Sequence, residues 1–309
     1  MGVMIDGTYQ IEDPGPDTTA KGHFERGRST LRDTALATDP SRYHLFVSWN
    51  CPWAHRALLV RAALDLPITL SVAKPARTDQ GWVFDDEGAY ADPLLGVRAL
   101  HEVYARQRPA YTGRVTVPVL WDKHIHQIVN NESADIVRAL SEAFDPSRSL
   151  IPARHLTQID DWNAKIYKTI NNGVYRAGFA RTQDAYDEAV HALFAALDAL
   201  EKHLEAHATL TGNEITEADL RLFPTLARFD AGYHYAFKCN IRRLRDYPQL
   251  WDYTRAFYAL PRVAETVKPE MYKAGYFSKS ELRNPLGIIP AGPIIDWTAP
   301  AERQFAWPS

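Results

Sequence analysis

The sequence contains little cysteine and no long hydrophobic run. Only two cysteines, Cys51 and Cys239, occur among its 309 residues, which excludes a scaffold held together by several disulfides. No segment approaches the ~18 uncharged apolar residues that a membrane-spanning helix needs. Residues 1–17 have neither the basic region nor the apolar region of a secretory signal. From these absences we expect a cytoplasmic protein with no membrane partner.

An excess of charge of one sign is also missing. The 35 basic and 38 acidic side chains leave a formal charge of −3, and no Lys/Arg cluster forms a stripe that could neutralise several phosphates. The sequence therefore predicts no nucleic-acid partner. With 46% hydrophobic and 24% charged residues, the composition is typical of a globular protein, and the length is sufficient for two domains.

The order of predicted elements gives an arm followed by a mixed α/β region. Residues 1–40 have no sustained apolar period, which predicts an irregular arm that carries little chemistry. After it we expect the order β-α-β, a polar insert over 74–114 with a short helix over 94–107, and then β-β-α. The predicted strands cover 43–49, 68–73, 116–122 and 126–130, and the predicted flanking helices cover 52–64 and 131–144.

From about residue 150 the pattern becomes helical throughout. Apolar residues at intervals of three and four over 159–170 and 190–204 predict amphipathic helices. Thr216 and Asp219 have the spacing of a capping box, which is a structural motif. The Pro-rich, apolar segment 287–309 suggests an arm laid against the body of the protein or against a second subunit.

Cys51 stands in the stretch SWNCPWAHR, directly after a predicted strand and before a proline. Because proline is tolerated in the first turn of a helix, the sulfur should face the unpaired N–H groups and the positive end of the helix dipole. Such surroundings favour the thiolate, and His55 and Arg56 in the same turn would add positive potential. The alternative is a buried, inert cysteine. The position favours a nucleophile.

A second thiol is missing where a dithiol motif would have it. The stretch reads Cys-Pro-Trp-Ala, so Ala54 takes the place of the second cysteine of a CxxC motif. A self-contained disulfide exchange is therefore excluded. A lone thiolate that attacks a sulfur atom becomes a mixed disulfide, which an external thiol has to resolve. The sequence thus predicts a small thiol as co-substrate.

Two other segments suit the binding of such a thiol. Val117 precedes Pro118 in a strand pattern, where an edge position or a cis bond would leave its N–H and C=O available to an extended peptide. Glu132 and Ser133 begin a helix directly after a strand. The helix-start N–H groups with the Ser133 hydroxyl suit a carboxylate, and Glu132 suits an ammonium. The alternative for Glu132 and Ser133 is plain helix capping.

Together these pieces, in this order, resemble the glutathione transferases, in which a thioredoxin-like half precedes an all-helical half. In particular, the sequence resembles one branch of this family, the glutathionyl-hydroquinone reductases or Xi-class transferases. The resemblance runs from about residue 40 to residue 293. The motifs that carry it are CPWAHR, the GW of the insert, TVPVLWD, VNNES, NNGVYRAGF, FKCNIRRLRDYP and NPLGIIPAGP.

The resemblance implies a fold and a reaction. It implies a thioredoxin-like domain over 41–146, an all-α domain over 147–309, and a homodimer. It also implies the reduction of glutathionyl-hydroquinones, aromatic thiol conjugates, with glutathione as co-substrate. Mycothiol or γ-glutamylcysteine is the alternative thiol. Hydroquinone leaves, Cys51 keeps the glutathionyl group, and a second glutathione releases it as glutathione disulfide.

Roles for individual residues follow from the same resemblance. Cys51 becomes the nucleophile, and two tyrosines line the pocket for the aromatic substrate, where their phenols bond to or protonate the departing hydroquinone. These tyrosines are Tyr175 and Tyr276. The implied glutathione contacts are Trp82, Arg114, Val117, Glu132 and Ser133.

Three other interpretations remain open at this point. The same mixed-disulfide chemistry would serve a dehydroascorbate reductase or a protein deglutathionylase, and a transferase fold can also bind ligands without turnover. The aromatic residues 162, 167, 175 and 276 favour the hydroquinone substrate.

His203 and His207 have the spacing of helical metal ligands but no third ligand nearby, so we predict no metal site. Cys239 is predicted to be a buried residue of the core with no part in the chemistry.

Overall fold

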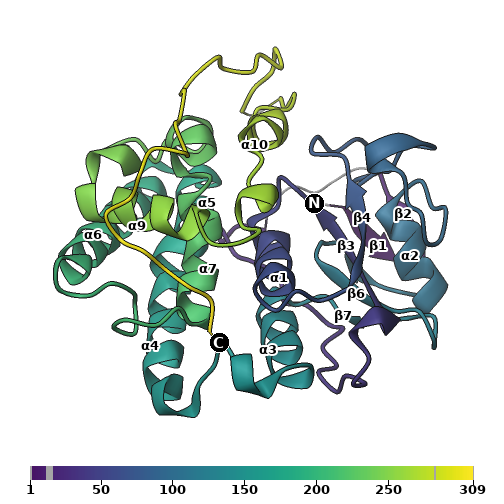
Figure 1. Cartoon of the computed structure of the whole chain (residues 1–309). Coiled ribbons are helices and arrows are strands. Elements are labelled where there is room, and N and C mark those ends of the chain that lie inside the picture. Colours follow the sequence, from purple (N-terminus) through teal and green to yellow (C-terminus); the bar gives the residue numbers. More distant parts are fainter. Residues whose placement is uncertain (1, 12–16, 282, 309) are drawn as a thin grey trace. The chain divides into compact units, whose positions relative to one another are not determined.

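The computed structural model describes residues 2–11, 17–281 and 283–308 (Figure 1). Contacts divide them into two compact units, and each unit is described by itself. Unit 1 comprises the described residues up to Asp17 and Arg26–Phe144, and unit 2 comprises Thr18–Glu25 and the described residues from Asp145 onward. Parts of the predicted arm (1 and 12–16) and of the predicted helical domain (282 and 309) lie outside the described residues.

Unit 1 is built on a four-stranded sheet in the order β4-β3-β6-β7. Strands β3 and β4 are parallel, whereas β6 pairs antiparallel with both β3 and β7. Helices α1 and α3 pack together on one face of this sheet, and α2 lies on the other (Figure 1). The elements are β3 (Tyr43–Ser48), α1 (Pro52–Ala63), β4 (Thr69–Ala73), α2 (Leu100–Gln107), β6 (Val119–Asp122), β7 (Gln127–Asn130) and α3 (Ser133–Ala143). The predicted order of elements is confirmed.

The helix predicted over 94–107 is shorter in the structure, because α2 begins only at Leu100. The preceding residues form turns around the buried carboxylate of Asp92, which accepts the N–H groups of Leu94, Leu95 and Val97, each at 3.1 Å. Gly96 has a φ of +62°, a conformation that a helix does not contain. The side chain of Asp92 thus competes with the helix for these N–H groups.

The arm is more regular than predicted. Strands β1 (Val3–Ile5) and β2 (Thr8–Gln10) pair with each other, and β1 also pairs with β5 (Gly113–Arg114). Residues 31–33 run along the outer edge of β7, where the N–H of Asn131 donates to Leu31 O at 2.9 Å and the N–H of Asp33 donates to Val129 O at 3.1 Å. The arm therefore covers a sheet edge that would otherwise expose unpaired backbone groups.

The named elements of unit 2 are all helical, as predicted. Its longest helix, α6 (Gln183–Ala206), packs against α5 and α9 and buries the predicted apolar stripe. The other α-helices are α4 (Leu156–Ile166), α5 (Gly173–Gly178), α7 (Glu217–Leu226), α8 (His234–Ala236), α9 (Pro248–Tyr258) and α10 (Pro269–Tyr276). Two π-helical turns, η5 (Tyr167–Asn171) and η6 (Phe229–Tyr233), interrupt this regular structure. Such turns occur frequently at functional sites.

The predicted capping box at the start of α7 is part of a larger buried network. The carboxylate of Asp219 accepts the backbone N–H of Thr216 at 2.9 Å, and it also accepts the Leu210 N–H and the Tyr253 hydroxyl, each at 2.9 Å. Burial raises the pKa of Asp219. This single side chain therefore joins the start of α7 to α9 and to the loop after α6.

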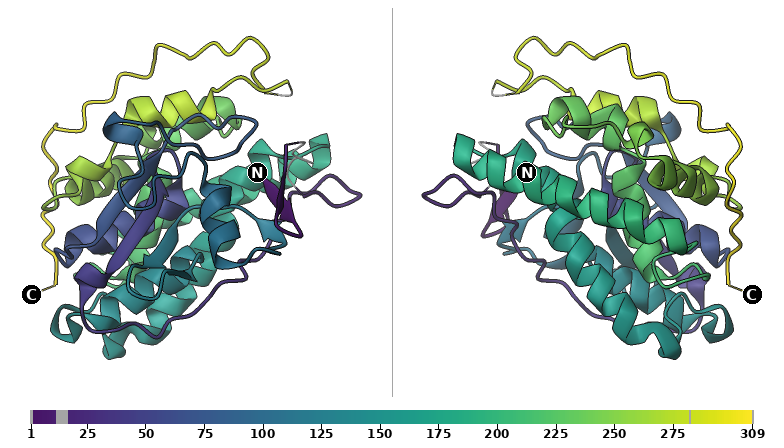
Figure 2. Two further views of the ribbon diagram at one scale, coloured as in Figure 1. Left: turned by 90° about the vertical axis from the view of Figure 1, so that its right-hand side faces the viewer. Right: turned by 90° about the vertical axis from the view of Figure 1, so that its left-hand side faces the viewer.

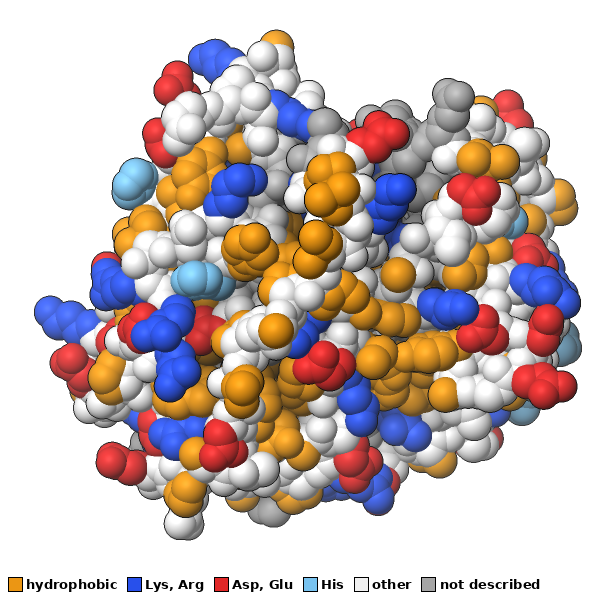
Figure 3. Space-filling view, turned by 90° about the horizontal axis from the view of Figure 1, so that it is seen from above, with side chains coloured by type: hydrophobic (Ala, Val, Ile, Leu, Met, Phe, Trp, Pro, Cys, Tyr) orange, Lys and Arg blue, Asp and Glu red, His pale blue; other side chains and the backbone are white. Residues whose placement is uncertain are grey.

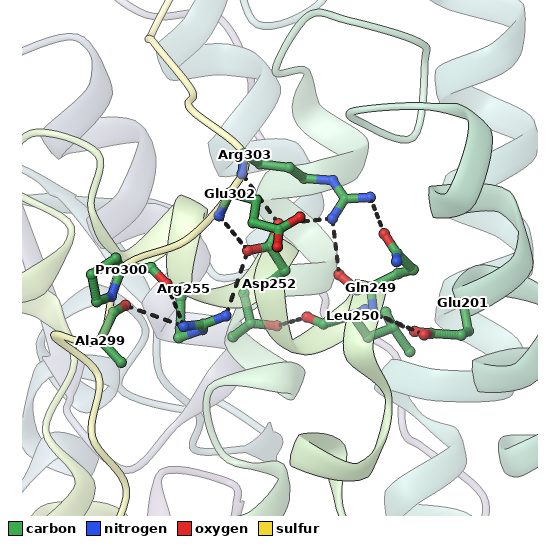
Figure 4. Close-up of polar contacts among 10 residues, drawn as sticks. Glu201, Gln249, Leu250, Asp252, Arg255, Ala299, Pro300, Glu302 and Arg303 are labelled. Atoms are coloured by element: carbon green, nitrogen blue, oxygen red, sulfur yellow. Dashed lines mark hydrogen bonds and ion pairs between the residues drawn. The ribbon is translucent and has the colours of Figure 1, made fainter.

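The C-terminal segment lies against α9 of its own chain, and Figure 2 shows it in yellow as an extended chain. Asp252 accepts the backbone N–H groups of Glu302 and Arg303 at 2.6 and 3.2 Å and pairs with the Arg303 guanidinium at 2.9 Å (Figure 4). Arg255 donates to the carbonyl oxygens of Ala299 and Pro300. The prediction of an arm laid against the body is therefore confirmed for residues 299–303.

The surface carries charge of both signs. On the face drawn in Figure 3, basic and acidic side chains are interspersed between apolar patches. This pattern agrees with the small net charge of the sequence. Among the described residues, no helix is long and apolar enough to cross a bilayer.

Candidate active site

Cys51 is the N-cap residue of α1, as its position before Pro52 predicts. Its backbone is extended (φ −80°, ψ 118°), and its sulfur accepts the N–H of Ala54 at a distance of 3.5 Å. This N–H is one of those at a helix start that have no partner within the helix. The Cys51 side chain is largely buried, with 8% exposure. The end of β3 and the start of α1 thus hold the sulfur at the positive end of a helix.

Val117 is the second residue of the site that the structure brings to the sulfur. The Cys51 thiol donates to Val117 O across 3.5 Å. The Val117–Pro118 peptide bond is cis, one of the two alternatives that the sequence left open. Strand β6 begins after it, at Val119.

Glu132 and Ser133 occupy the start of α3, where Glu132 is the N-cap. The Glu132 carboxylate accepts the N–H of Ala134 at 3.2 Å, so helix capping, the plainer of the two predicted roles, is confirmed. The buried Ser133 hydroxyl accepts from Nη1 of Arg56 at 3.4 Å. A guanidinium from α1 thus reaches the N-terminus of α3, and the two positive features together suit an anion.

Two guanidinium groups stack on Trp53, two residues after Cys51. The Cζ atoms of Arg26 and Arg56 each lie 4.5 Å from the centre of the Trp53 ring, within the range of a cation–π contact. Arg56 is 3% exposed. Arg56, one of the two residues predicted to add positive potential, therefore lies beside the start of α1 together with Arg26, which belongs to the arm.

The arm contributes more to this region than the sequence suggested. The hydroxyl of Ser29 lies 3.1 Å from Oε2 of Glu132 and 3.2 Å from Asn131 O. Together with Arg26, it shows that the arm contacts the residues predicted for the site. No local pattern in residues 1–40 could have revealed these contacts, because the partners are about a hundred positions away in the chain.

Trp82 and Arg114 lie on or beside the insert. Trp82 is buried, its carbonyl accepts the N–H of Leu100 at 2.9 Å, and Arg77 lies 5.6 Å from its ring centre. Arg114, in β5, forms an ion pair of 2.6 Å with Asp17. Their assignment as glutathione contacts stays a prediction.

In unit 2, the two predicted tyrosines meet. The hydroxyls of Tyr175 and Tyr276 are 3.2 Å apart, and the hydroxyl of Tyr276 also lies 2.8 Å from that of Tyr233. Burial raises the pKa values of Tyr233 and Tyr276 well above the ordinary value. Both phenols therefore keep their protons at neutral pH and can donate hydrogen bonds.

Tyr233 is a residue that the sequence reasoning missed. It ends the π-helical turn η6 and is fully buried. The signal that could have indicated it is the run GYHYAF over 232–237, in which aromatic residues follow Gly232. A Cβ atom on Gly232 would lie 2.8 Å from Cδ2 of Tyr276, so only glycine lets the two segments come this close.

The tyrosines belong to a larger aromatic cluster. The ring of Tyr175 lies 5.3 Å from that of Phe237 and 5.9 Å from that of Phe179, and Phe24 lies 5.3 Å from Phe179. The last glycine of NNGVYRAGF has a role here, because a Cβ on Gly178 would lie 2.2 Å from Cγ of Phe237. This part of the motif is therefore explained by packing.

The other two of the four aromatic residues that favoured a hydroquinone substrate, Trp162 and Tyr167, have different surroundings. Trp162 contacts the edge of His203, with ring centres 4.9 Å apart, and Lys165 lies 5.0 Å from its ring. Tyr167 is 41% exposed. Helical periodicity could not distinguish Trp162 and Tyr167 from Tyr175, because all three stand in segments with a helical pattern.

Cys239 is buried packing, as predicted. It is fully buried, its sulfur lies 3.8 Å from Phe237 O, and burial raises the pKa of its thiol strongly. His203 and His207 stack on each other with ring centres 4.3 Å apart. The part of the chain that the structure describes contains no group of three or more His, Cys, Asp or Glu residues placed to hold a metal ion.

Comparison with known proteins gives the same two-part organisation. Residues 50–143 match the model of the glutathione S-transferase N-terminal domain, and residues 183–256 match that of the C-terminal domain. Unit 1 is thus the thioredoxin-like half and unit 2 the all-helical half of this fold.

Individual relatives cover nearly the whole chain. The glutathionyl-hydroquinone reductase PcpF of Sphingobium chlorophenolicum is 45% identical over 95% of this chain and 96% of its own length. The corresponding enzyme YqjG of Escherichia coli is 43% identical over 98% of this chain and 99% of its own. Among solved structures, a Xi-class transferase from Natrialba magadii matches with a TM-score of 0.88 at 38% identity, covering 99% of this chain and 98% of its own. The glutathione-bound structure of YqjG matches with a TM-score of 0.84 at 42% identity, covering 97% and 98%. The chain belongs to the glutathionyl-hydroquinone reductases, the Xi class of the glutathione transferases.

Proposed function

We propose that this protein reduces glutathionyl-hydroquinones to hydroquinones, with glutathione as co-substrate and Cys51 as nucleophile. The observation that carries the proposal is the Cys51 sulfur, which accepts a helix-start N–H from Ala54 and has no second thiol in the next turn. A thiolate held in this way can attack a sulfur atom but needs an external thiol to be released. The relatives named as glutathionyl-hydroquinone reductases support the same reaction.

The proposed reaction has two steps. In the first, the Cys51 thiolate attacks the sulfur of the glutathionyl group, and the bond between this sulfur and the aromatic carbon breaks. The electron pair of that bond stays on the aromatic carbon, which takes up a proton and leaves as hydroquinone. In the second step, the thiolate of a second glutathione attacks the mixed disulfide. Glutathione disulfide leaves, and the Cys51 thiolate is restored.

We assign the binding of glutathione to the thioredoxin-like domain over 41–146. Val117 offers backbone groups to the peptide next to the Cys51 sulfur, while Ser133 with the start of α3 suits the γ-glutamyl carboxylate and Glu132 suits its ammonium. Trp82 and Arg114 are proposed as further walls of this site. Arg56, which donates to Ser133, adds positive charge there.

We assign the aromatic group of the substrate to the all-helical domain over 147–309. Tyr175 and Tyr276 are proposed to bond to the leaving hydroquinone and to supply its proton. The hydrogen bonds of Tyr276 to Tyr175 and Tyr233 support this role, because they hold the phenols in fixed orientation. A buried phenol with a raised pKa is still protonated when the aromatic carbon needs a proton.

A limiting amount of a glutathionyl-hydroquinone should leave one glutathionyl group on Cys51, detected as a mass adduct that added thiol removes. Cys51→Ala should abolish the reduction. Cys51→Ser should abolish it too, because an alcohol keeps the size of the thiol but forms no mixed disulfide.

Cys239→Ser is the matched control, since burial raises the pKa of that thiol and it should play no part in turnover. Reduction of the conjugate by Cys51→Ser at the wild-type rate would contradict the mechanism. A protein that binds glutathione but forms no adduct would instead be a non-catalytic binder.

Tyr175→Phe and Tyr276→Phe should each lower kcat for the conjugate by ~10²–10⁴-fold, the usual loss when a general acid is removed. The dissociation constant of glutathione should change much less, because the phenols face the aromatic group and not the peptide. Steady-state kinetics and glutathione titration measure the two effects. Tyr272→Phe is the matched control, as its buried hydroxyl donates to Thr266 O at 3.5 Å. Equally small effects on rate and thiol affinity would mean that these phenols only pack.

Assembly and location complete the proposal. We propose a homodimer, because Leu286, Ile288 and Ile294 are 79%, 65% and 90% exposed and would gain from cover by a second copy. Light scattering should then show a dimer at micromolar concentration, and a monomer would contradict the proposal.

We also propose a cytoplasmic location, where thiols stay reduced. Recovery of the protein with membranes in cell fractionation would contradict it.

A further inference from the structure

The phenol of Tyr104, in α2, uses its full hydrogen-bonding capacity. Its hydroxyl donates to Thr116 O at 2.9 Å, and its oxygen accepts from Nδ2 of Asn131 at 3.1 Å and from the Thr116 N–H at 3.4 Å. A phenol has one donor and two acceptor positions, so all three are occupied. The side chain is fully buried, and burial raises its pKa to about 12. The hydroxyl therefore remains a donor over the working pH range of an enzyme.

The partners of Tyr104 directly precede the two segments that we propose to hold glutathione. Thr116 is followed by Val117, whose carbonyl accepts the Cys51 thiol. Asn131 is followed by Glu132 and Ser133 at the start of α3. The two segments come from different elements, one before β6 and the other after β7. The single hydroxyl of Tyr104 joins them.

Asn131 is held on its other side by the arm. Its Oδ1 accepts the N–H of Leu31 at 3.3 Å, and its backbone N–H donates to Leu31 O at 2.9 Å. This fixes the orientation of the amide, with the oxygen toward Leu31 and the nitrogen toward Tyr104. The buried Asn131 side chain thus transmits the position of Tyr104 to Glu132 and Ser133.

We propose that Tyr104 is a positioning residue for glutathione, whose phenol sets the spacing between the Val117 backbone and the Glu132–Ser133 helix start. The proposal rests on the proposed glutathione site. Glutathione would have to contact both segments at once, so its affinity depends on how firmly their separation is fixed. Tyr104 itself touches neither the thiol nor the aromatic substrate in this account.

Tyr104→Phe should raise the dissociation constant of glutathione about tenfold, because three buried polar groups lose their partner and the two segments can move apart. The constant is measured by isothermal titration in the Cys51→Ala background, where no mixed disulfide can form. In protein that retains Cys51, the KM for glutathione should rise by a similar factor while kcat changes less than about twofold.

Tyr43→Phe is the matched control for loss of a buried hydroxyl. Tyr43 is 1% exposed and lies in β3, in the four-stranded sheet of unit 1. Its oxygen accepts the N–H of Ala37 at 2.7 Å. Both substitutions should lower the melting temperature, but only Tyr104→Phe should weaken glutathione binding. An unchanged dissociation constant in Tyr104→Phe, with the same loss of stability as Tyr43→Phe, would overturn the proposal.

Asn131→Asp tests the other end of the bridge that the Tyr104 hydroxyl forms between Thr116 and Asn131. It keeps the acceptor for Leu31 and removes the amide N–H that donates to Tyr104. It should also raise the dissociation constant of glutathione, and the double variant with Tyr104→Phe should show less than the product of the two effects. Full additivity would mean that the two residues do not act through one bridge, which would overturn the proposal. If Tyr104→Phe folds poorly, an unchanged dissociation constant in Asn131→Asp alone would overturn it.

Ser133→Ala and Glu132→Gln separate this inference from the site on which it rests. If they leave the dissociation constant unchanged, the proposed glutathione site is wrong and the bridge has no ligand to serve. If they raise it while Tyr104→Phe and Asn131→Asp do not, the site is correct and only the positioning role is wrong. The proposal requires all four substitutions to weaken binding.

Discussion

The contact between the Cys51 sulfur and the N–H of Ala54 is the interaction on which the proposed function of this protein depends. It exists because α1 begins at Pro52, so that Cys51, the last of the three residues between β3 and α1, is the N-cap of the helix. Serine, threonine or aspartate usually takes this role. A cysteine in their place gives up some capping strength and in return places a sulfur atom at the positive end of a helix.

Further polar contacts surround this arrangement. Val117 O accepts the proton of the Cys51 thiol, a contact that the thiolate does not make, and Arg56 of α1 donates to Ser133 at the start of α3. The two helix starts and the Val117 backbone therefore form a connected set of polar groups within unit 1. The tyrosine cluster of unit 2 is likewise fixed by hydrogen bonds between its phenols and by the close approach that Gly232 permits.

Much of this could be predicted from the sequence where the signals are local. The strand–Cys–Pro–helix order placed Cys51 correctly, the X-Pro step at Val117 indicated an edge or a cis bond, and the spacing of Thr216 and Asp219 indicated the cap of α7. Each of these signals lies within a few residues of its structural consequence. The resemblance of the longer motifs then indicated the family.

The features that escaped prediction depend on contacts between distant segments. The arm forms strands because Val3–Ile5 pairs with Gly113–Arg114, and its role beside Glu132 depends on Ser29. The late start of α2 is an exception, because Asp92 acts locally on the N–H groups of Leu94, Leu95 and Val97. Tyr233 and Tyr104 carry no local mark of their partners, which lie 43 residues away in one case and 12 and 27 in the other. Periodicity reports which face of an element is buried, not which distant polar group it meets there.

The central claim is that the helix start activates Cys51, and the direct measurement is the titration of its thiolate. The ultraviolet absorbance of the thiolate is followed against pH in Cys239→Ser protein, where Cys51 is the single remaining cysteine. The account predicts a midpoint below the ~8.5 of an ordinary cysteine, because the helix-start N–H groups stabilise the negative charge. A midpoint at or above that value would show that burial outweighs the helix start and would contradict the account.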